Sequence, residues 1–489
     1  MDWGSRITYL ASTAFKDRVV PFGIKDEDRQ KHVCVIGKAG SARESLIVRM
    51  ALQDIERGLG IVILDATGDL APVVMERLSE EELKRLVYVD VSDAEYPFSW
   101  NSAKEFRAAP RGAALFPDAF ASLYGVARSA FTDFFAHWIL TDESRTVLSP
   151  QMILSDDRER ELAFQKESGA DAELAALREV HREEEKVFVE NGRFLLKDTV
   201  VRNVVGQHMH KVSFDKLAEG AIFIFDFSRI RMYPTRVAPV VRLAAYALRA
   251  WSDENSATAL YMHDCLRHLT EHDIEQLLND QHYALTLSDT LYRAADRPLR
   301  EKALSRCGSV VTFSPHQSDV ELVQKMYFPY VSPEELQGLE AGEACVLLTI
   351  DAARAKPFFA NALDLPERKS VSLQDILVES RKKHTVPRTQ ADEQFKQHVA
   401  AEQDTNKPPF NDAFRNIFAR RDPAAALAMG SKKPDAPKPP VEPPPTPPPA
   451  PTKAPPPTAP PPPHVSAQST RELPEDELKA LLFVAPLLI

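Results

Sequence analysis

The stretch VCVIGKAGSARES, residues 33–45, runs from an apolar strand pattern into a loop that contains glycine. A loop of the form G-x-x-x-x-G-K-[ST] cradles phosphates with its backbone N–H groups, while its Lys reaches the β/γ-phosphates and its hydroxyl holds Mg²⁺. Gly37 and Gly40 fit such a loop, but Ala42, Arg43 and Glu44 stand where Gly, Lys and Ser/Thr are expected. The stretch therefore predicts the backbone of a phosphate-binding loop without its chemistry.

Apolar runs and helical patterns alternate on both sides of this loop. Residues 46–55 carry apolar side chains at helical spacing. Further continuous apolar runs predict buried strands at residues 60–70, 86–92, 221–228, 257–265, 282–289, 309–314 and 343–351. Continuous apolar strands separated by helices are typical of a parallel sheet that is covered on both faces. The sequence thus predicts an α/β fold with a doubly wound parallel sheet.

The sheet pattern is interrupted once and then completed. Residues 105–200 lack strand signals and contain long, highly charged helical stretches, so we expect an all-helical insertion there. The insertion separates a first part of the sheet core, residues 1–104, from a second part, residues 201–370. A helical extension is expected over residues 371–433.

Two C-terminal segments differ from the rest. Residues 434–463 contain eighteen prolines in thirty positions, which favours extended polyproline II and predicts a disordered linker or a ligand for proline-reading domains. Residues 464–489 predict a short helix, because Pro474 and three acidic residues precede leucines that share one face. This helix either docks on a protein partner or folds back on its own chain.

Composition narrows the class of protein. The net charge of −11 excludes a globally basic, nucleic-acid-type surface, although a local basic patch is compatible with it. The four cysteines show no C-x-x-C spacing, so a reducing compartment is expected rather than a disulfide or zinc framework. The N-terminus lacks a signal-peptide pattern, and no apolar run reaches the length of about 18 residues that a membrane span needs. We therefore expect a cytoplasmic chain without a membrane span.

Several stretches together resemble one family. They are PFGIKDEDRQKHVCVIGKAG (21–40), ILDATGDL (63–70), VYVDVSDAEYPFSWN (87–101), VVRNVVGQ (200–207), FDKLAEGAIFIFDFS (214–228), ALYMHDC (259–265) and LQDILVESRKKHTVPR (373–388). The chain resembles the TraG/TraD-like coupling ATPases of conjugative and type IV secretion systems, within the HerA/FtsK group of P-loop motors. The resemblance covers residues 1–399. It implies a RecA-like core with an all-α insertion, assembled as a hexameric ring that translocates DNA.

The resemblance also assigns four catalytic parts, and each of the four carries at least one substitution. The nucleotide would contact Gly37, Lys38, Gly40, Ser41, Ala42, Arg43 and Glu44. The catalytic acid pair of Walker B falls on His263 and Asp264, the polar sensor on Asp289 and Thr290, and the trans-acting arginine on Ser314. Arg43 is planar and bulky where a compact Lys charge is needed, and Glu44 places a carboxylate where a hydroxyl should hold Mg²⁺. Substitution at all four parts predicts that hydrolysis is lost.

Ligand expectations follow from these positions. We expect no cofactor, with ATP and Mg²⁺ bound only if the altered loop still holds them. His263, Asp264, His268 and His272 cluster after one strand, and His268 and His272 at i, i+4 would share a helix face. No H-E-x-x-H pattern surrounds them, so we predict no metal site.

The turn after the second strand, at residues 65–69, allows two interpretations. Gly68 can supply an unusual turn geometry while Asp69 caps the following helix. Alternatively, Asp65, Gly68 and Asp69 border the nucleotide or contact a neighbouring subunit. We expect the first, structural interpretation.

Three functions follow from the sequence. The favoured one is a hydrolysis-deficient structural or adaptor subunit, in a ring of its own copies or with a related ATPase, at the inner face of the membrane through partners. The second is an active ATP-dependent DNA-translocating motor, and the third is a DNA-binding protein without motor activity. The expected partners are DNA, a related ATPase, and a protein that binds the proline-rich arm and C-terminal helix.

Overall fold

The computed structural model describes residues 6–15, 18–154, 180–253, 257–290, 297–369 and 372–402. Both predicted C-terminal segments, residues 434–463 and 464–489, lie outside the described residues. So do residues 155–179 of the predicted insertion and residues 403–433 of the predicted helical extension.

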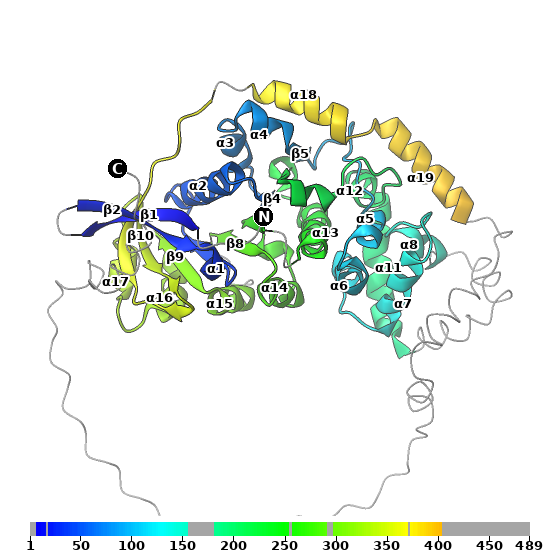
Figure 1. Ribbon diagram of the computed structural model, residues 1–489. Coiled ribbons are helices and arrows are strands. Elements are labelled where there is room, and N and C mark those ends of the chain that lie inside the picture. The colour runs from blue at the N-terminus through cyan, green and yellow to red at the C-terminus, as the bar shows by residue number, and fades with distance from the viewer. Residues whose placement is uncertain are drawn as a thin grey trace, which may run out of the picture.

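A mostly parallel sheet of eleven strands, counted over the described residues, forms the centre of the fold (Figure 1). Its parallel part has the order β9-β3-β8-β7-β4-β6-β5. These strands are β3 (Val33–Ile36), β4 (Gly60–Asp65), β5 (Leu86–Asp90), β6 (Ile222–Asp226), β7 (Thr258–His263), β8 (Ala284–Asp289) and β9 (Ser309–Phe313). An apolar run predicted each of them, and the doubly wound α/β fold class is confirmed.

Antiparallel strands extend the sheet beyond β9. They are β10 (Glu343–Leu347), β13 (Phe358–Ala362), β1 (Ile7–Phe15) and β2 (Arg18–Lys25), with a separate small ribbon of β11 (Thr349–Ile350) and β12 (Ala353–Arg354). Sequence analysis predicted β10 but not β1, β2 or β13. The outer strand β2 explains part of this omission, because its exposed and buried residues are mixed and leave no continuous apolar run.

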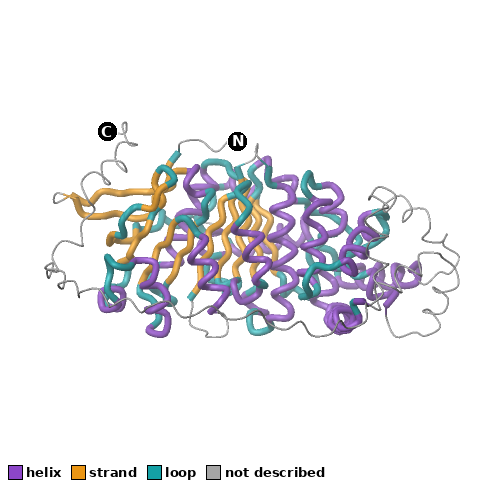
Figure 2. Tube along the Cα trace, turned by 90° about the horizontal axis from the view of Figure 1, so that it is seen from below, coloured by secondary structure: helices purple, strands orange, loops and turns teal. Residues whose placement is uncertain are grey.

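Helices cover both faces of the parallel strands (Figure 2). In β3, Val33 and Val35 pack into one core with α2 and α3, whereas Cys34 and Ile36 pack into the other with α13 to α16. The first face carries α2 (Arg43–Glu56), α3 (Ala71–Met75) and α4 (Glu80–Lys84); the second carries α13 (Pro234–Trp251), α14 (Glu271–Leu278), α15 (Arg297–Arg306) and α16 (Val320–Tyr327). Burial on both faces explains why these strands are apolar at every position.

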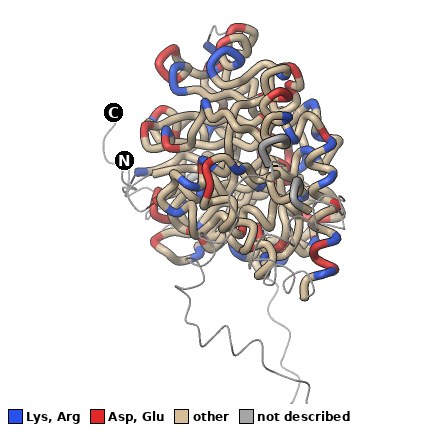
Figure 3. The backbone as a smooth tube through the Cα atoms, turned by 90° about the vertical axis from the view of Figure 1, so that its right-hand side faces the viewer, with Lys and Arg blue, Asp and Glu red and all other residues tan. Residues whose placement is uncertain are grey.

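A helical segment lies between β5 and β6 in sequence, and beyond the sheet on the side away from the β1–β2 hairpin (Figures 1 and 2). Its described helices are α5 (Ser102–Ala108), α6 (Gly112–Leu123), α7 (Ala130–Leu140), α8 (Ser149–Leu154), α11 (Arg182–Lys197) and α12 (Thr199–Val205). Phe188 lies at its centre, stacked on Tyr124 with ring centroids 4.0 Å apart. Figure 3 shows Lys and Arg interspersed with Asp and Glu on this side of the molecule.

Two further helices follow the sheet core, α18 (Leu373–His384) and α19 (Arg388–Glu402). They run along the outside of the molecule, where α18 packs on β5 and α19 packs on α8 and α12 (Figure 1). Short helices complete the described chain: α1 (Asp26–Arg29), α17 (Pro333–Gln337), and the 3₁₀ turns η1 (Phe214–Glu219), η2 (Ser228–Ile230), η3 (Leu266–His268) and η5 (Gln317–Asp319).

Within the ranges that the structure covers, none of the helices has both the length and the apolar character that crossing a bilayer requires.

Candidate functional site

The predicted site residues meet at the carboxyl edge of the parallel strands. The order β3-β8-β7 places a single strand between the strand that enters the glycine loop and the strand that ends at His263. The register pairs Ile36 with Asp289 and His263 with Ser288, so all three strands end at the same level. Ligands of open α/β sheets bind in crevices at this edge, which makes it the candidate site.

The glycine loop, residues 37–42, keeps a tight strand-to-helix turn. A Cβ on Gly37 would lie 2.9 Å from the Cβ of Phe313, so this position needs glycine. The Lys38 N–H donates to the Ser314 carbonyl at 3.0 Å, and the Lys38 side chain is exposed. Ser314 thus contacts the loop through its backbone, while its own side chain is buried.

Ala42 has the backbone conformation of a glycine. It is the N-cap of α2 with φ of +74°, close to the φ of +75° at Gly40. This left-handed conformation costs a non-glycine residue about 1 kcal/mol. The loop therefore retains a conformation that glycine would favour, although the glycine itself has been replaced.

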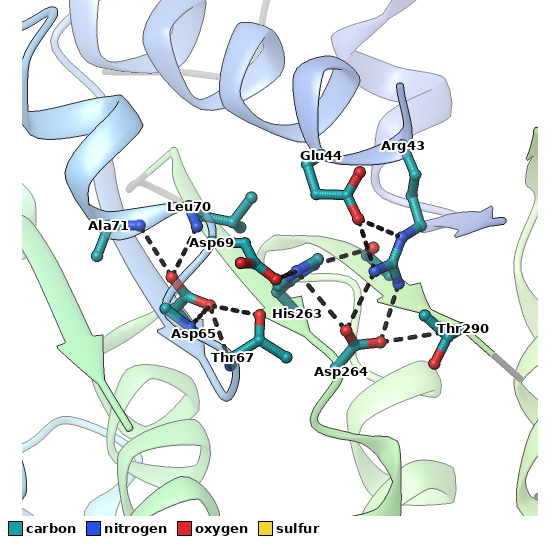
Figure 4. A network of polar contacts seen from close by, with 12 residues as sticks. Arg43, Glu44, Asp65, Thr67, Asp69, Leu70, Ala71, His263, Asp264 and Thr290 are labelled. Carbon is teal, nitrogen blue, oxygen red and sulfur yellow. Dashed lines mark hydrogen bonds and ion pairs between the residues drawn. The ribbon is translucent and has the colours of Figure 1, made fainter. Parts of the chain in front are cut away.

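Arg43 begins α2 and directs its guanidinium toward Asp264 (Figure 4). It is 1% exposed and donates two hydrogen bonds to the Asp264 carboxylate, from Nη1 to Oδ1 at 2.9 Å and from Nη2 to Oδ2 at 3.1 Å. Its Nε and Nη2 also donate to Glu44 Oε1 at 3.2 and 2.9 Å. The guanidinium therefore joins Glu44, at the position where the resemblance places the Mg²⁺-binding hydroxyl, to Asp264, the second residue of the Walker B pair.

The electrostatics of this cluster favour the ionised pair. Burial alone would raise the pKa of Asp264, but the hydrogen bonds and charge of Arg43 outweigh it and lower that pKa. Burial disfavours the charged form of Arg43, yet Asp264 and Glu44 raise the Arg43 pKa above its ordinary value. Bidentate Arg–carboxylate pairs are among the stronger hydrogen-bonded interactions in proteins. Arg43 is consequently engaged with two carboxylates inside the site.

His263 lies next to the Arg43–Asp264 pair and is fully buried. Its Nδ1 is 3.2 Å from Ser288 Oγ, and its Nε2 is 3.7 Å from Asp264 Oδ2 and 3.9 Å from Asp69 Oδ2. Sequence analysis missed Ser288. The alternation of side chains along β8 could have indicated it, because Ser288 and Asp289 must face opposite sides of the sheet.

The two predicted sensor residues, Asp289 and Thr290, contact different parts of the fold. Asp289 is buried, with Oδ1 3.8 Å from Nη2 of Arg300 on α15. The Thr290 backbone N–H donates to Asp264 Oδ1 at 3.0 Å. The structure thus brings His263, Asp264 and the Thr290 backbone to the Arg43 cluster, whereas Asp289 lies toward α15.

The turn at residues 65–69 is organised by Asp65, which is fully buried. Its carboxylate accepts the backbone N–H groups of Gly68, Leu70 and Ala71, each at 2.8 Å, and so caps the start of α3 (Figure 4). The expectation that Asp69 provides this cap was wrong. Gly68 has φ of +82°, and after it the Asp69 side chain lies near His263 instead of over the helix terminus.

The expected pairing of His268 and His272 on one helix face was also wrong. His268 ends the 3₁₀ turn η3, and a new helix, α14, begins after the N-cap Thr270, so the two residues do not share a helix. His272 Nε2 instead lies 3.1 Å from Asp118 Oδ1. Over the residues that were described, no group of three or more His, Cys, Asp or Glu side chains could hold a metal ion.

Comparison with known proteins gives matches among solved structures only. No protein-family model matches the chain, and no curated protein does. The bacterial conjugative coupling protein TrwBdeltaN70, in complex with sulphate, matches at 13% identity and a TM-score of 0.46, over 71% of this chain and 88% of that one. The plasmid coupling protein TrwB in complex with ADP and Mg²⁺ matches at 14% and 0.47, over 72% and 88%.

A third match is VirB4 of Thermoanaerobacter pseudethanolicus, at 12% identity and a TM-score of 0.44, over 73% of this chain and 96% of that one. At such values the strand order and register of this chain remain the evidence for its fold.

Proposed function

We propose that this chain is a coupling-protein-like subunit of a DNA-transfer machine that does not hydrolyse ATP and acts as a structural or adaptor component. The observation that carries the proposal is the buried guanidinium of Arg43, bonded to both Asp264 and Glu44. The motif resemblance to type IV secretion coupling ATPases supplies the class of machine.

The ion pair opposes nucleotide binding because the pair would have to open first. Breaking a buried pair by removing one partner typically costs about 3–5 kcal/mol. If a triphosphate had to separate Arg43 from Asp264, its affinity would fall by roughly 10²–10⁴-fold.

The acidic groups around the pair oppose the triphosphate as well. Glu44, Asp264 and Asp69 all lie at this edge, and two like charges about 4 Å apart repel by about 4 kcal/mol at an effective dielectric of 20. Mg²⁺ would reduce this repulsion only if the site could hold it. His263 is a poor ligand for Mg²⁺, which prefers oxygen, and Asp264 already binds Arg43.

The remaining parts of the proposal concern partners. The motif resemblance supports a ring built from copies of this chain or shared with a related ATPase. Residues 434–463 and 464–489 provide a spacer and an apolar segment for a protein partner. Such a partner would hold the chain at the inner face of the membrane.

The decisive experiment is ATP turnover by the purified full chain, with and without DNA, compared with the Asp264→Asn variant. We expect the two proteins to give the same background rate, since a contaminating ATPase is unaffected by the substitution. Turnover by the natural chain that disappears in Asp264→Asn would overturn the proposal.

A rebuilt loop provides the positive control. The combined variant Ala42→Gly, Arg43→Lys and Glu44→Thr restores the G-K-[ST] pattern and releases Asp264 from its guanidinium partner. We expect Mg-ATP to raise the melting temperature of this variant but not that of the natural chain. An equal rise in both proteins would contradict the ion-pair argument.

A further inference from the structure

Two exposed loops of this chain have opposite charge and similar apolar character. The first, residues 229–236 with sequence RIRMYPTR, follows β6 and contains three arginines and no acidic residue. Met232 is 78% exposed and Tyr233 is 54% exposed. We call it the basic loop.

The second, residues 328–340 with sequence FPYVSPEELQGLE, lies between α16 and β10, includes the short helix α17, and contains three glutamates and no basic residue. Phe328 is 71% exposed and Tyr330 is 46% exposed, and Glu334 and Glu340 are also exposed. We call it the acidic loop.

The arginines of the basic loop make contacts within the chain, but Arg229 and Arg231 remain exposed to solvent. The Arg236 guanidinium lies 4.8 Å from the centre of the Tyr233 ring and donates to Asp198 at 2.7 Å, so it supports Tyr233 from behind. Arg229 is paired with Asp90 at 3.4 Å but stays 70% exposed. Arg231, which is exposed, donates weakly to the Thr67 carbonyl at 3.4 Å. Exposed Arg, Met and Tyr side chains are the composition enriched in protein interfaces.

The two loops cannot meet within one chain. The basic loop follows β6, and the acidic loop follows β9 and α16. In the sheet, β6 lies five positions from β9, which is roughly 24 Å at the usual strand spacing. Figure 1 accordingly shows α16 and α17 toward the end of the sheet that carries the β1–β2 hairpin, whereas α13 lies toward the helical segment.

We propose that the basic loop of one copy docks on the acidic loop of a second copy. The exposed Arg229 and Arg231 face the exposed glutamates of the acidic loop, and the pairs Met232–Tyr233 and Phe328–Tyr330 bury one another between them. Because the two surfaces differ, the contact is head-to-tail, and repetition closes it into a ring or extends it as a filament. Arg231 also touches the Thr67 turn, so the second copy covers the rim of the candidate site. The contact does not depend on whether ATP is hydrolysed.

Cysteine cross-linking of the full chain tests the orientation. All four native cysteines are buried, so an introduced surface cysteine reacts alone. A mixture of Met232→Cys and Phe328→Cys proteins should form a mixed disulfide dimer on oxidation, and neither protein alone should form one. Val19→Cys is the matched control, because Val19 is 77% exposed but lies on β2. Only 232–232 or 328–328 links, or no link above the Val19 level, would overturn the proposal.

Charge reversal tests the recognition. Arg231→Glu on the Met232→Cys protein should abolish the mixed disulfide, and Glu334→Arg on the Phe328→Cys protein should restore it. A single-stranded oligonucleotide is the competing occupant of the basic loop. If Arg231→Glu removes salt-dependent oligonucleotide binding and leaves cross-linking unchanged, the basic loop binds nucleic acid and the proposed contact is wrong.

Discussion

Asp264→Asn is the substitution that tests the buried pair most directly. Asn keeps the shape of Asp and tolerates the left-handed backbone at this position, where φ is +52°. It also keeps the oxygen that accepts the Thr290 N–H. The change therefore removes the negative charge of the Asp264 carboxylate that pairs with the Arg43 guanidinium, and it leaves the surrounding backbone unchanged.

The size of the effect follows from the burial of Arg43. Its side chain is 1% exposed, so water cannot replace the lost carboxylate. Removing one partner of a buried pair usually costs about 3–5 kcal/mol. Glu44 still accepts from Nε and Nη2 of Arg43, so we expect a loss of about 2–3 kcal/mol in the free energy of unfolding.

Urea unfolding of the full chain at neutral pH measures this loss. Glu44→Gln is the matched control, because it removes the charge of the other partner, is 19% exposed, and keeps an acceptor oxygen. We expect the control to lose about 1 kcal/mol. The double variant Arg43→Met with Asp264→Asn should lose less than the sum of its parts, because it leaves no unpaired guanidinium.

Two results would refute this reasoning. A free energy of unfolding for Asp264→Asn within about 0.5 kcal/mol of the natural chain would mean that the pair is weak. Additive effects in the double variant would mean that the two side chains are not coupled. Either result would also remove the energetic obstacle to phosphates that the proposed function needs.

Three further predictions concern other positions. Ala42→Gly should raise the free energy of unfolding by about 1 kcal/mol in urea, because φ of +74° strains alanine, and a loss would contradict this. Asp280 is buried, yet the hydrogen bonds of Arg111 help to lower its pKa from 3.8 to about 2, so its stabilisation is present above pH 4 and is lost as the pH falls through 2. Asp280→Asn should therefore cost about 2 kcal/mol at pH 7 and almost nothing at pH 2, and a constant difference between these pH values would be inconsistent with titration. Asp54→Ala should lower stability by about 3–5 kcal/mol because it leaves the fully buried Arg29 without its carboxylate, and a melting temperature close to that of the natural chain would exclude this.

The sequence predicted the parallel part of the sheet because each of those strands is apolar along its whole length. A strand between two helical layers has no solvent-facing side, so its consecutive residues are all apolar and the strand can be predicted from the sequence. The altered loop could also be recognised from the sequence, because Ala42, Arg43 and Glu44 can be compared position by position with the G-K-[ST] of the phosphate-binding motif. For the outer strand β2, mixed exposed and buried residues gave no comparable signal.

The sequence by itself determined which residues stand at the altered loop, and that Asp264 directly follows a buried strand. Only the tertiary structure decided that Arg43 reaches Asp264, 221 positions away, and that Asp65 rather than Asp69 caps α3. The physical reason is that hydrogen bonds depend on the order in which strands lie side by side, and chain order does not specify it. Local spacing predicts where strands end. Which cation pairs with a buried carboxylate depends on which side chains the fold places within about 3 Å of it, as with Arg43 and Asp264.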